Sequence, residues 1–193
     1  MSRNLLQALW HNLGYPSLRM ENTGIGQVTN NELKFQEELF SQAALPTILA
    51  ALYQYSRSSK GAESLLYANL SSDWTSWLLG DHKMEIILKI AVYSNLTKEE
   101  VNKKTTAITE EAIRVLRQQV TKFGTNEDVK NTLADTLDEV LLHLPIHMEI
   151  EEFLKIRPVI FQVSKSQGPD PISGINSEHY SHLGETEKIN PDQ

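Results

Sequence analysis

The sequence predicts an all-α protein: an irregular multihelical bundle that contains a long antiparallel helical hairpin and ends in a flexible C-terminal tail. Apolar residues recur at steps of three and four in nearly every apolar segment, which is the period of a helix that buries one face. Capping patterns and glycines separate these segments. The run at residues 159–163 is the only one with a strand-like pattern, and a single strand cannot build a sheet.

The 193 residues fit one helical domain, expected over residues 1–163, with the tail at residues 164–193. A hydrophobic content of 40% with 22% charged residues is typical of a globular domain. The formal net charge of −7 gives no electrostatic reason to approach a phosphate backbone, so nucleic-acid binding is not expected. The chain has no cysteine, which excludes disulfides, thiolate metal sites and cysteine nucleophiles.

The first helix is expected to end at Gly14, and a polar loop is expected over residues 17–31. Five apolar residues fall on one side of this helix: Leu5, Leu6, Leu9, Trp10 and Leu13. Polar residues interrupt them and no small-residue cleavage site follows, so the segment does not match a signal peptide. Because no apolar stretch reaches the length of a membrane span, we expect a cytoplasmic protein without one.

The second helix is expected to begin near Asn31 and to be interrupted at or before Pro46, because proline lacks the N–H and its ring clashes with the preceding turn. From Pro46 a new helix is expected to continue through Tyr55. This helix is apolar on most faces and therefore belongs in the centre of the fold. A turn at residues 57–61 and a short helix over residues 62–70 are expected to follow.

A short helix with two tryptophans is expected next, capped by Ser71 or Ser72 and closed by Gly80. Asp81 is the expected cap of the following helix, over residues 82–93. That helix also leaves little polar surface, which favours a buried position.

The clearest helix starts at Thr97, where Thr97-Lys98-Glu99-Glu100 forms a capping box, and is expected to end at Gly124. Another helix starts almost at once at Thr125, so the two are expected to form the antiparallel hairpin. Their shared interface is predicted to hold Val101, Ile108, Val115 or Leu116, Leu133, Leu137 and Leu141. Three ion pairs at i,i+4 spacing are predicted on the first helix: Glu99 with Lys103, Glu100 with Lys104, and Glu110 with Arg114. A short helix near residues 150–154 follows the break at Pro145.

Three tryptophans are the candidate interaction residues: Trp10, Trp74 and Trp77. Trp74 and Trp77 are either an aromatic anchor for a partner or two indoles that fasten a short helix over the core, and the second interpretation is preferred. The apolar stripe around Trp10 has three candidate positions: on the body of the protein, on a second copy, or on a membrane surface. The membrane is the weakest of these, because only Arg3 and the terminal amine supply positive charge.

No catalytic residue, cofactor or metal ligand is predicted. His143 and His147 have the spacing of two ligands on one helix face, but Pro145 between them breaks the helix. The sequence has no nucleophile elbow, phosphate-binding loop or His-Glu-x-x-His pattern. Enzyme activity is therefore not the favoured interpretation.

Three segments resemble the YidB-like family of uncharacterised helical bacterial proteins. They are Leu45-Pro46-Thr47-Ile48-Leu49-Ala50-Ala51-Leu52-Tyr53, the turn ending Lys60-Gly61-Ala62-Glu63, and Asn95-Leu96-Thr97-Lys98-Glu99-Glu100-Val101. The resemblance covers about residues 40–120 and implies an all-α fold. It implies no reaction and transfers no site residue.

The leading hypothesis is a non-enzymatic, bacterial, cytoplasmic interaction protein that self-associates through apolar helix faces as a homo-oligomer. One alternative is a small-molecule or lipid carrier with a cavity among the apolar helices at residues 46–55 and 82–93. Another alternative is an enzyme with a site that the sequence does not reveal.

Overall fold

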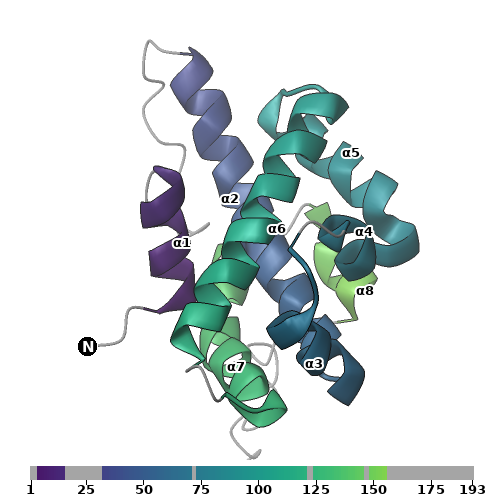
Figure 1. Cartoon of the computed structure of the whole chain (residues 1–193). Helices are drawn as coiled ribbons and strands as arrows, with labels where there is room; N and C mark the ends of the chain where they lie inside the picture. The colour runs from purple at the N-terminus through teal and green to yellow at the C-terminus, as the bar shows by residue number, and fades with distance from the viewer. Residues whose placement is uncertain (1–3, 16–31, 71–72, 121–123, 146–147, 156–193) are drawn as a thin grey trace, which may run out of the picture. The chain divides into compact units, whose positions relative to one another are not determined.

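The computed structural model describes residues 4–15, 32–70, 73–120, 124–145 and 148–155, all within the compact unit formed by residues 1–159. These residues form helices and turns without a strand, which confirms the all-α class (Figure 1). The helices are α1 (Leu5–Leu13), α2 (Glu32–Ser56), α3 (Ser59–Tyr67), α4 (Trp74–Leu79), the 3-10 helix η1 (Gly80–His82), α5 (Lys83–Ser94), α6 (Lys98–Gln119), α7 (Asn126–His143) and α8 (Ile150–Leu154). The predicted loop at 17–31, the strand-like run at 159–163 and the predicted tail lie outside the described residues.

Helix α2 is the centre of the core, as the apolar pattern predicts. Every residue from Ser41 to Leu52 is buried. Helices α3, α5, α6 and α7 all pack against α2, and α6 crosses it in Figure 1. The buried hydroxyl of Thr47 donates a hydrogen bond of 2.6 Å to the carbonyl oxygen of Ala43, so this polar group satisfies itself within the helix.

Pro46 lies inside α2, and the predicted interruption there is wrong. A proline in a helix interior costs about 3 kcal/mol, because it removes one backbone hydrogen bond and crowds the preceding turn. Full burial of a leucine or isoleucine side chain contributes about 1.5–3 kcal/mol. Leu45, Ile48, Leu49 and Leu52 are all buried within six residues of the proline, so packing on both sides outweighs the local cost.

The capping box predicted at Thr97 is confirmed, and the structure adds a second one at Thr125. At α6, the hydroxyl of Thr97 accepts a hydrogen bond from the backbone N–H of Glu100 at 3.2 Å, and the Glu100 carboxylate accepts one from the backbone N–H of Thr97 at 3.0 Å. Thr125 and Asp128 form the same reciprocal pair at the start of α7. α6 ends at Gln119, before the predicted end at Gly124.

Three helix starts differ from the prediction. α3 begins at Ser59, because the Ser58 side chain accepts a hydrogen bond from the backbone N–H of Gly61 at 2.9 Å. α4 is capped by Asp73, whose carboxylate accepts from the backbone N–H of Ser76, and not by a serine at 71 or 72. Asp81 lies within η1, which leads directly into α5, so it does not cap that helix.

Helices α6 and α7 run in opposite directions, as the hairpin predicts. The 3.3 Å ion pair between Lys104 and Glu37 places the first half of α6 beside the first half of α2. The Gln42 side chain bonds the carbonyl of His143, so the end of α7 lies beside the first half of α2.

The residues predicted for the interface between α6 and α7 are buried, apart from Leu137, but their main partners lie on other helices. Each of them packs more extensively against α1 or α2 than against the other. The Asn12 side chain of α1 bonds Glu111 on α6, and the Asn4 side chain before α1 bonds Glu139 on α7. Leu137 is only partly buried, whereas Val129, Leu133, Val140 and Leu141 of the same helix are buried.

Candidate functional site

The three candidate tryptophans have different environments. Trp74 is 1% exposed, and its indole N–H donates a 2.9 Å hydrogen bond to the carbonyl oxygen of Asn69. Trp77 stacks edge-on against Trp74 with ring centroids 5.0 Å apart, yet remains 47% exposed. Trp10 packs partly buried on α1, which lies mainly against α6, α7 and α2. Trp74 therefore fastens α4 over the core, while Trp77 lies at its edge.

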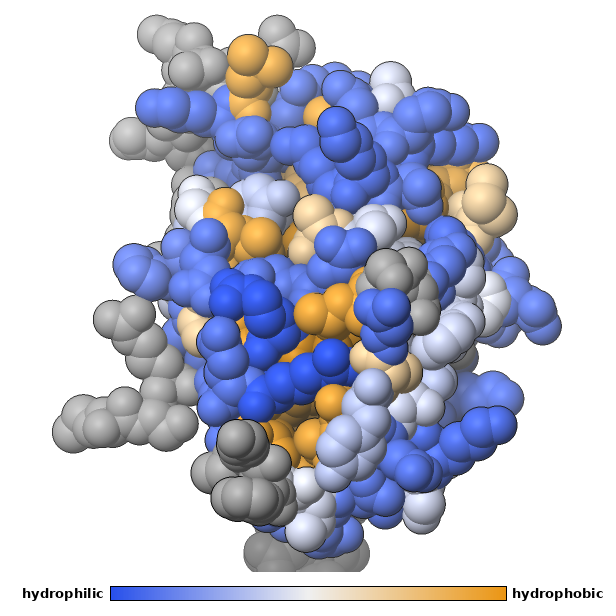
Figure 2. All heavy atoms as spheres, viewed as in Figure 1, coloured by the Kyte–Doolittle hydropathy of each residue, from blue (hydrophilic) through white to orange (hydrophobic). Residues whose placement is uncertain are grey.

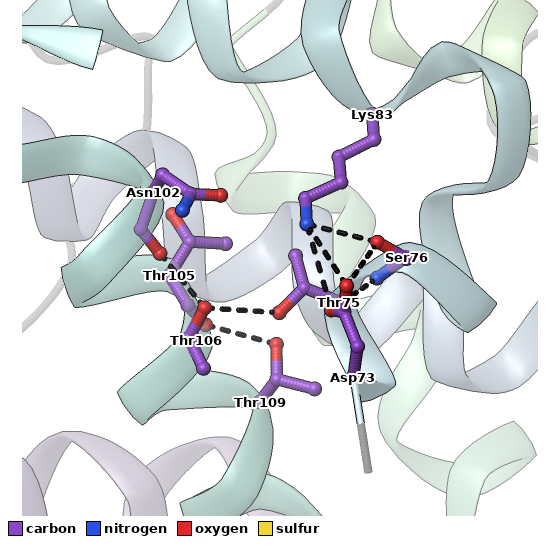
Figure 3. Close-up of polar contacts among 8 residues, drawn as sticks. All are labelled: Asp73, Thr75, Ser76, Lys83, Asn102, Thr105, Thr106 and Thr109. Atoms are coloured by element: carbon purple, nitrogen blue, oxygen red, sulfur yellow. Dashed lines mark hydrogen bonds and ion pairs between the residues drawn. The ribbon is translucent and has the colours of Figure 1, made fainter. Parts of the chain in front are cut away.

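Asp73, Ser76 and Lys83 form a polar cluster where α4 meets α5 (Figure 3). The Ser76 hydroxyl donates to the Asp73 carboxylate at 2.5 Å, and the Lys83 ammonium donates to the Ser76 hydroxyl at 2.9 Å. The hydrogen bonds from the Ser76 side chain and backbone hold the pKa of Asp73 below its usual value, and Lys83 adds to this effect. A 3.4 Å bond between the hydroxyls of Thr75 and Thr106 joins α4 to α6 nearby.

This cluster has the residue types of a nucleophilic site but not its chemistry. A serine nucleophile needs a neighbouring base that accepts its proton. The Asp73 carboxylate is a weak base because its pKa is lowered, and it already caps α4. Neither of the two surface grooves described below includes Asp73, Ser76 or Lys83. The arrangement fits a link that fixes the start of α4 to α5.

The histidine pair of the sequence does not form a ligand set in the described residues. His143 is buried at the end of α7, and its carbonyl oxygen accepts a hydrogen bond from Gln42. His147 lies outside the described residues. In the part of the chain that the structure describes, no group of three or more histidine, aspartate or glutamate side chains is placed to hold a metal ion.

The outer side of α5 carries three exposed apolar side chains. Met84 is 67% exposed, Leu88 is 41% exposed and Val92 is 74% exposed. Because a helix turns about 100° per residue, positions four apart lie nearly above one another. These three residues therefore form one stripe, which we name the α5 face. The opposite side of α5 is anchored in the core by Ile86, Ile87, Ile90 and Ala91.

A groove of about 380 Å³ lies beside the α5 face. Its walls are Leu88, Lys89, Val92, Tyr93 and Met148. The Lys89 ammonium donates to the carbonyl oxygen of Met148 at 2.9 Å and lies 3.8 Å from the Glu149 carboxylate. The groove is thus mainly apolar, and Lys89 is the charged residue in its lining. Together with the α5 face it forms a continuous apolar region, since both include Leu88 and Val92.

A second groove, of about 630 Å³, lies where the start of α2 meets the turn between α5 and α6. It is lined by Leu33, Lys34, Gln36, Glu37, Asn95, Leu96, Thr97, Glu100 and Lys104. Many of its polar groups bond one another: Lys104 pairs with Glu37, and Gln36 donates to the carbonyl oxygen of Asn95. The groove is therefore built around internal contacts of the fold.

Three cations of α6 are engaged within the fold: Lys104, Arg114 and Arg117. Lys104 forms its ion pair with Glu37 and not with the predicted Glu100. Arg114 pairs with Glu111 and not with the predicted Glu110. Arg117 donates from its guanidinium to the carbonyl oxygens of Leu65 and Ala68, both at 2.6 Å. These side chains are therefore held by contacts inside the fold, whereas Lys98 and Lys103 are exposed.

The α5 face was missed in the sequence because its helix is apolar on most sides and was expected to be buried. The four-residue spacing of Met84, Leu88 and Val92, next to Glu85 and Lys89, was the signal of an outward side. Elsewhere, on the face drawn in Figure 2, hydrophobic residues reach the surface in separate patches among hydrophilic ones.

Comparisons of the chain with models of protein families, with curated proteins and with solved structures gave no match. Among the described helices, none is both long enough and apolar enough to cross a membrane. The function is therefore argued from the residues and their geometry.

Proposed function

We propose that this protein is a non-enzymatic interaction protein that self-associates through the α5 face. The observation that carries the proposal is the exposure of Met84, Leu88 and Val92 along one side of a helix whose other side is anchored in the core. Contiguous exposed apolar surface is typical of protein–protein contact sites, whereas single exposed residues are common everywhere.

The α5 face is also preorganised for binding. Its three side chains project from a regular helix, so association orders little backbone. Each CH₂ group that a partner removes from water contributes about 0.8 kcal/mol. The neighbouring groove lets a partner bury the sides of Leu88 and Val92 as well as their tips.

The two alternatives have weaker support. A carrier needs a cavity between the apolar helices, but α2 and α5 pack directly against each other, and the described grooves lie at the surface. An enzyme needs an activated nucleophile or a metal, and the Asp73–Ser76–Lys83 cluster offers no strong base. The cytoplasmic location, the bacterial origin and the YidB-like resemblance remain predictions from the sequence that agree with this function.

The test compares Leu88→Asp with Leu142→Asp in sedimentation velocity. Leu88 and Leu142 are 41% and 45% exposed, so the two variants place the same charge at equally exposed leucines on different helices. We expect the wild type and Leu142→Asp to dimerise alike, and Leu88→Asp to remain monomeric. Circular dichroism confirms that both variants keep their helices. A wild type that is monomeric up to about 1 mM, where association is worth only about −4 kcal/mol, contradicts the proposal.

A further inference from the structure

We infer that the second copy lies antiparallel across the α5 face, on a two-fold axis through Leu88, so that Glu85 of each copy meets Lys89 of the other. This inference rests on the proposed self-association and names its geometry. Closed dimers of identical chains are commonly two-fold symmetric, with the same patch on both copies.

The stripe itself is symmetric about Leu88. Met84 precedes it by four residues and Val92 follows it by four, so they lie about 40° to either side of it around the helix. An antiparallel two-fold arrangement places Leu88 against its own copy. It also places Met84 beside Val92 of the other copy at both ends of the stripe. The contact between Met84 of one copy and Val92 of the other therefore forms twice, and it covers both ends of the stripe.

The charges beside the stripe select the antiparallel direction. Glu85 and Lys89 lie on the same flank of α5, about 60° and 100° from Leu88. In an antiparallel pair this flank of one copy faces the same flank of the other copy, which runs in the opposite direction. Glu85 of one copy then lies next to Lys89 of the other, with an offset of about 3 Å along the helix axis. In a parallel pair it meets the opposite flank, where Ile87 and Ala91 lie.

The groove fits the same arrangement. The reversed flank brings Glu85 of the second copy over the groove that Lys89 lines beside Leu88 and Val92. The methylene groups of the glutamate then contact the apolar walls. Its carboxylate meets Lys89 in addition to the Met148 carbonyl and the Glu149 carboxylate that Lys89 contacts within its own copy. Within the described residues Glu85 is exposed and takes part in no ion pair, so its charge is free to act between copies. Ion pairs at such a rim set orientation more than affinity.

The test uses Glu85→Lys and Lys89→Glu. Each variant alone places like charges opposite each other twice, and we expect its dimer to be weakened about tenfold. An equimolar mixture restores both pairs, so native mass spectrometry should show mainly the mixed dimer. Glu99→Lys and Lys103→Glu on α6 change the same charges at the same spacing elsewhere and should show no such preference.

A second measurement does not depend on the charged variants. Because the chain has no cysteine, Met84→Cys and Val92→Cys report the direction by disulfide formation. A cross-link formed in the mixture and not by either variant alone supports the antiparallel pair. A cross-link formed by Met84→Cys alone overturns it while leaving self-association intact. A wild type that does not dimerise overturns both the geometry and the proposed function.

Discussion

The side-chain amide of Gln42 donates a hydrogen bond to the carbonyl oxygen of His143, 3.1 Å away in the buried core. The last carbonyl groups of a helix have no partner within it, and His143 is the last residue of α7. The amide therefore satisfies the end of α7 from α2, the helix against which α7 packs most extensively. This contact links the end of α7 to the first half of α2.

Replacing Gln42 by leucine should lower the free energy of unfolding by about 1–3 kcal/mol, because the His143 carbonyl is left buried without this donor. Gln36→Leu is the matched control. Gln36 also donates at 3.1 Å to a carbonyl oxygen, that of Asn95, but at an exposed site where water can replace it. Urea denaturation measures both variants. Equal losses for the two would contradict the assigned role of Gln42.

Arg117→Lys should destabilise the protein although it keeps the charge. The planar guanidinium reaches the carbonyl oxygens of Leu65 and Ala68 at the end of α3 together, and a lysine ammonium does not match that fork. Burial lowers the pKa of Arg117, which agrees with a partly desolvated cation. We expect a loss of about 1.5–3 kcal/mol, the range for a hydrogen bond that involves a charged group.

Arg114→Lys is the control on the same helix. Arg114 is exposed and pairs with Glu111 at the surface, where ion pairs contribute little. Thermal unfolding followed by circular dichroism should show a clear drop in Tm for Arg117→Lys and almost none for Arg114→Lys. If the two melting curves coincide, the bonds of Arg117 to α3 do not stabilise the fold.

Local signals predicted much of this fold, because they depend only on neighbouring residues. The capping boxes at Thr97 and Thr125 specify the starts of α6 and α7, and Gly14, with φ +71°, ends α1 as expected. The continuity of α2 through Pro46 depends instead on burial contributed by other helices. No pattern within the segment records that contribution, so the sequence alone predicts a break.

The candidate site shows the same limit. The sequence selected Trp74 and Trp77 by residue type, but only the packing of α4 separates a buried anchor from a half-exposed neighbour. The exposure of the α5 face depends on which side of α5 the other helices cover. In a helix with few polar residues, the sequence gives little sign of which side is exposed. For α5 the sign is the four-residue spacing of Met84, Leu88 and Val92.

Leu133→Ala should cost about 2–5 kcal/mol, the usual range for truncating a buried leucine. Leu133 is 2% exposed in the stripe of α7 that faces the core. Leu137, one turn later, is only partly buried, and Leu137→Ala should cost clearly less. Guanidinium denaturation of the two variants tests the orientation of α7. A larger loss for Leu137→Ala would contradict this orientation of α7.

The decrease in the free energy of unfolding at low pH should depend in part on the two capping boxes. Hydrogen bonds from the backbone N–H and the hydroxyl of Thr97 lower the pKa of Glu100, and those of Thr125 lower the pKa of Asp128. In the folded state these carboxyls therefore hold their protons less tightly than in the unfolded chain. Their contribution is present above the unfolded pKa, about 4, and is lost as the pH falls through the lower folded values.

Glu100→Gln and Asp128→Asn keep an acceptor oxygen but remove the charge, so they isolate this effect. At pH 7 the wild type should unfold at higher urea concentration than either variant, and the difference should shrink as the pH falls below about 4, where the carboxylates become protonated. Glu99→Gln, next to Glu100 but outside the capping box, should show a smaller change. Urea titrations at pH 7, 5 and 3 measure this. A difference between wild type and variants that stays constant from pH 7 to pH 3 would show that the charge of the capping carboxylates does not stabilise the two helices.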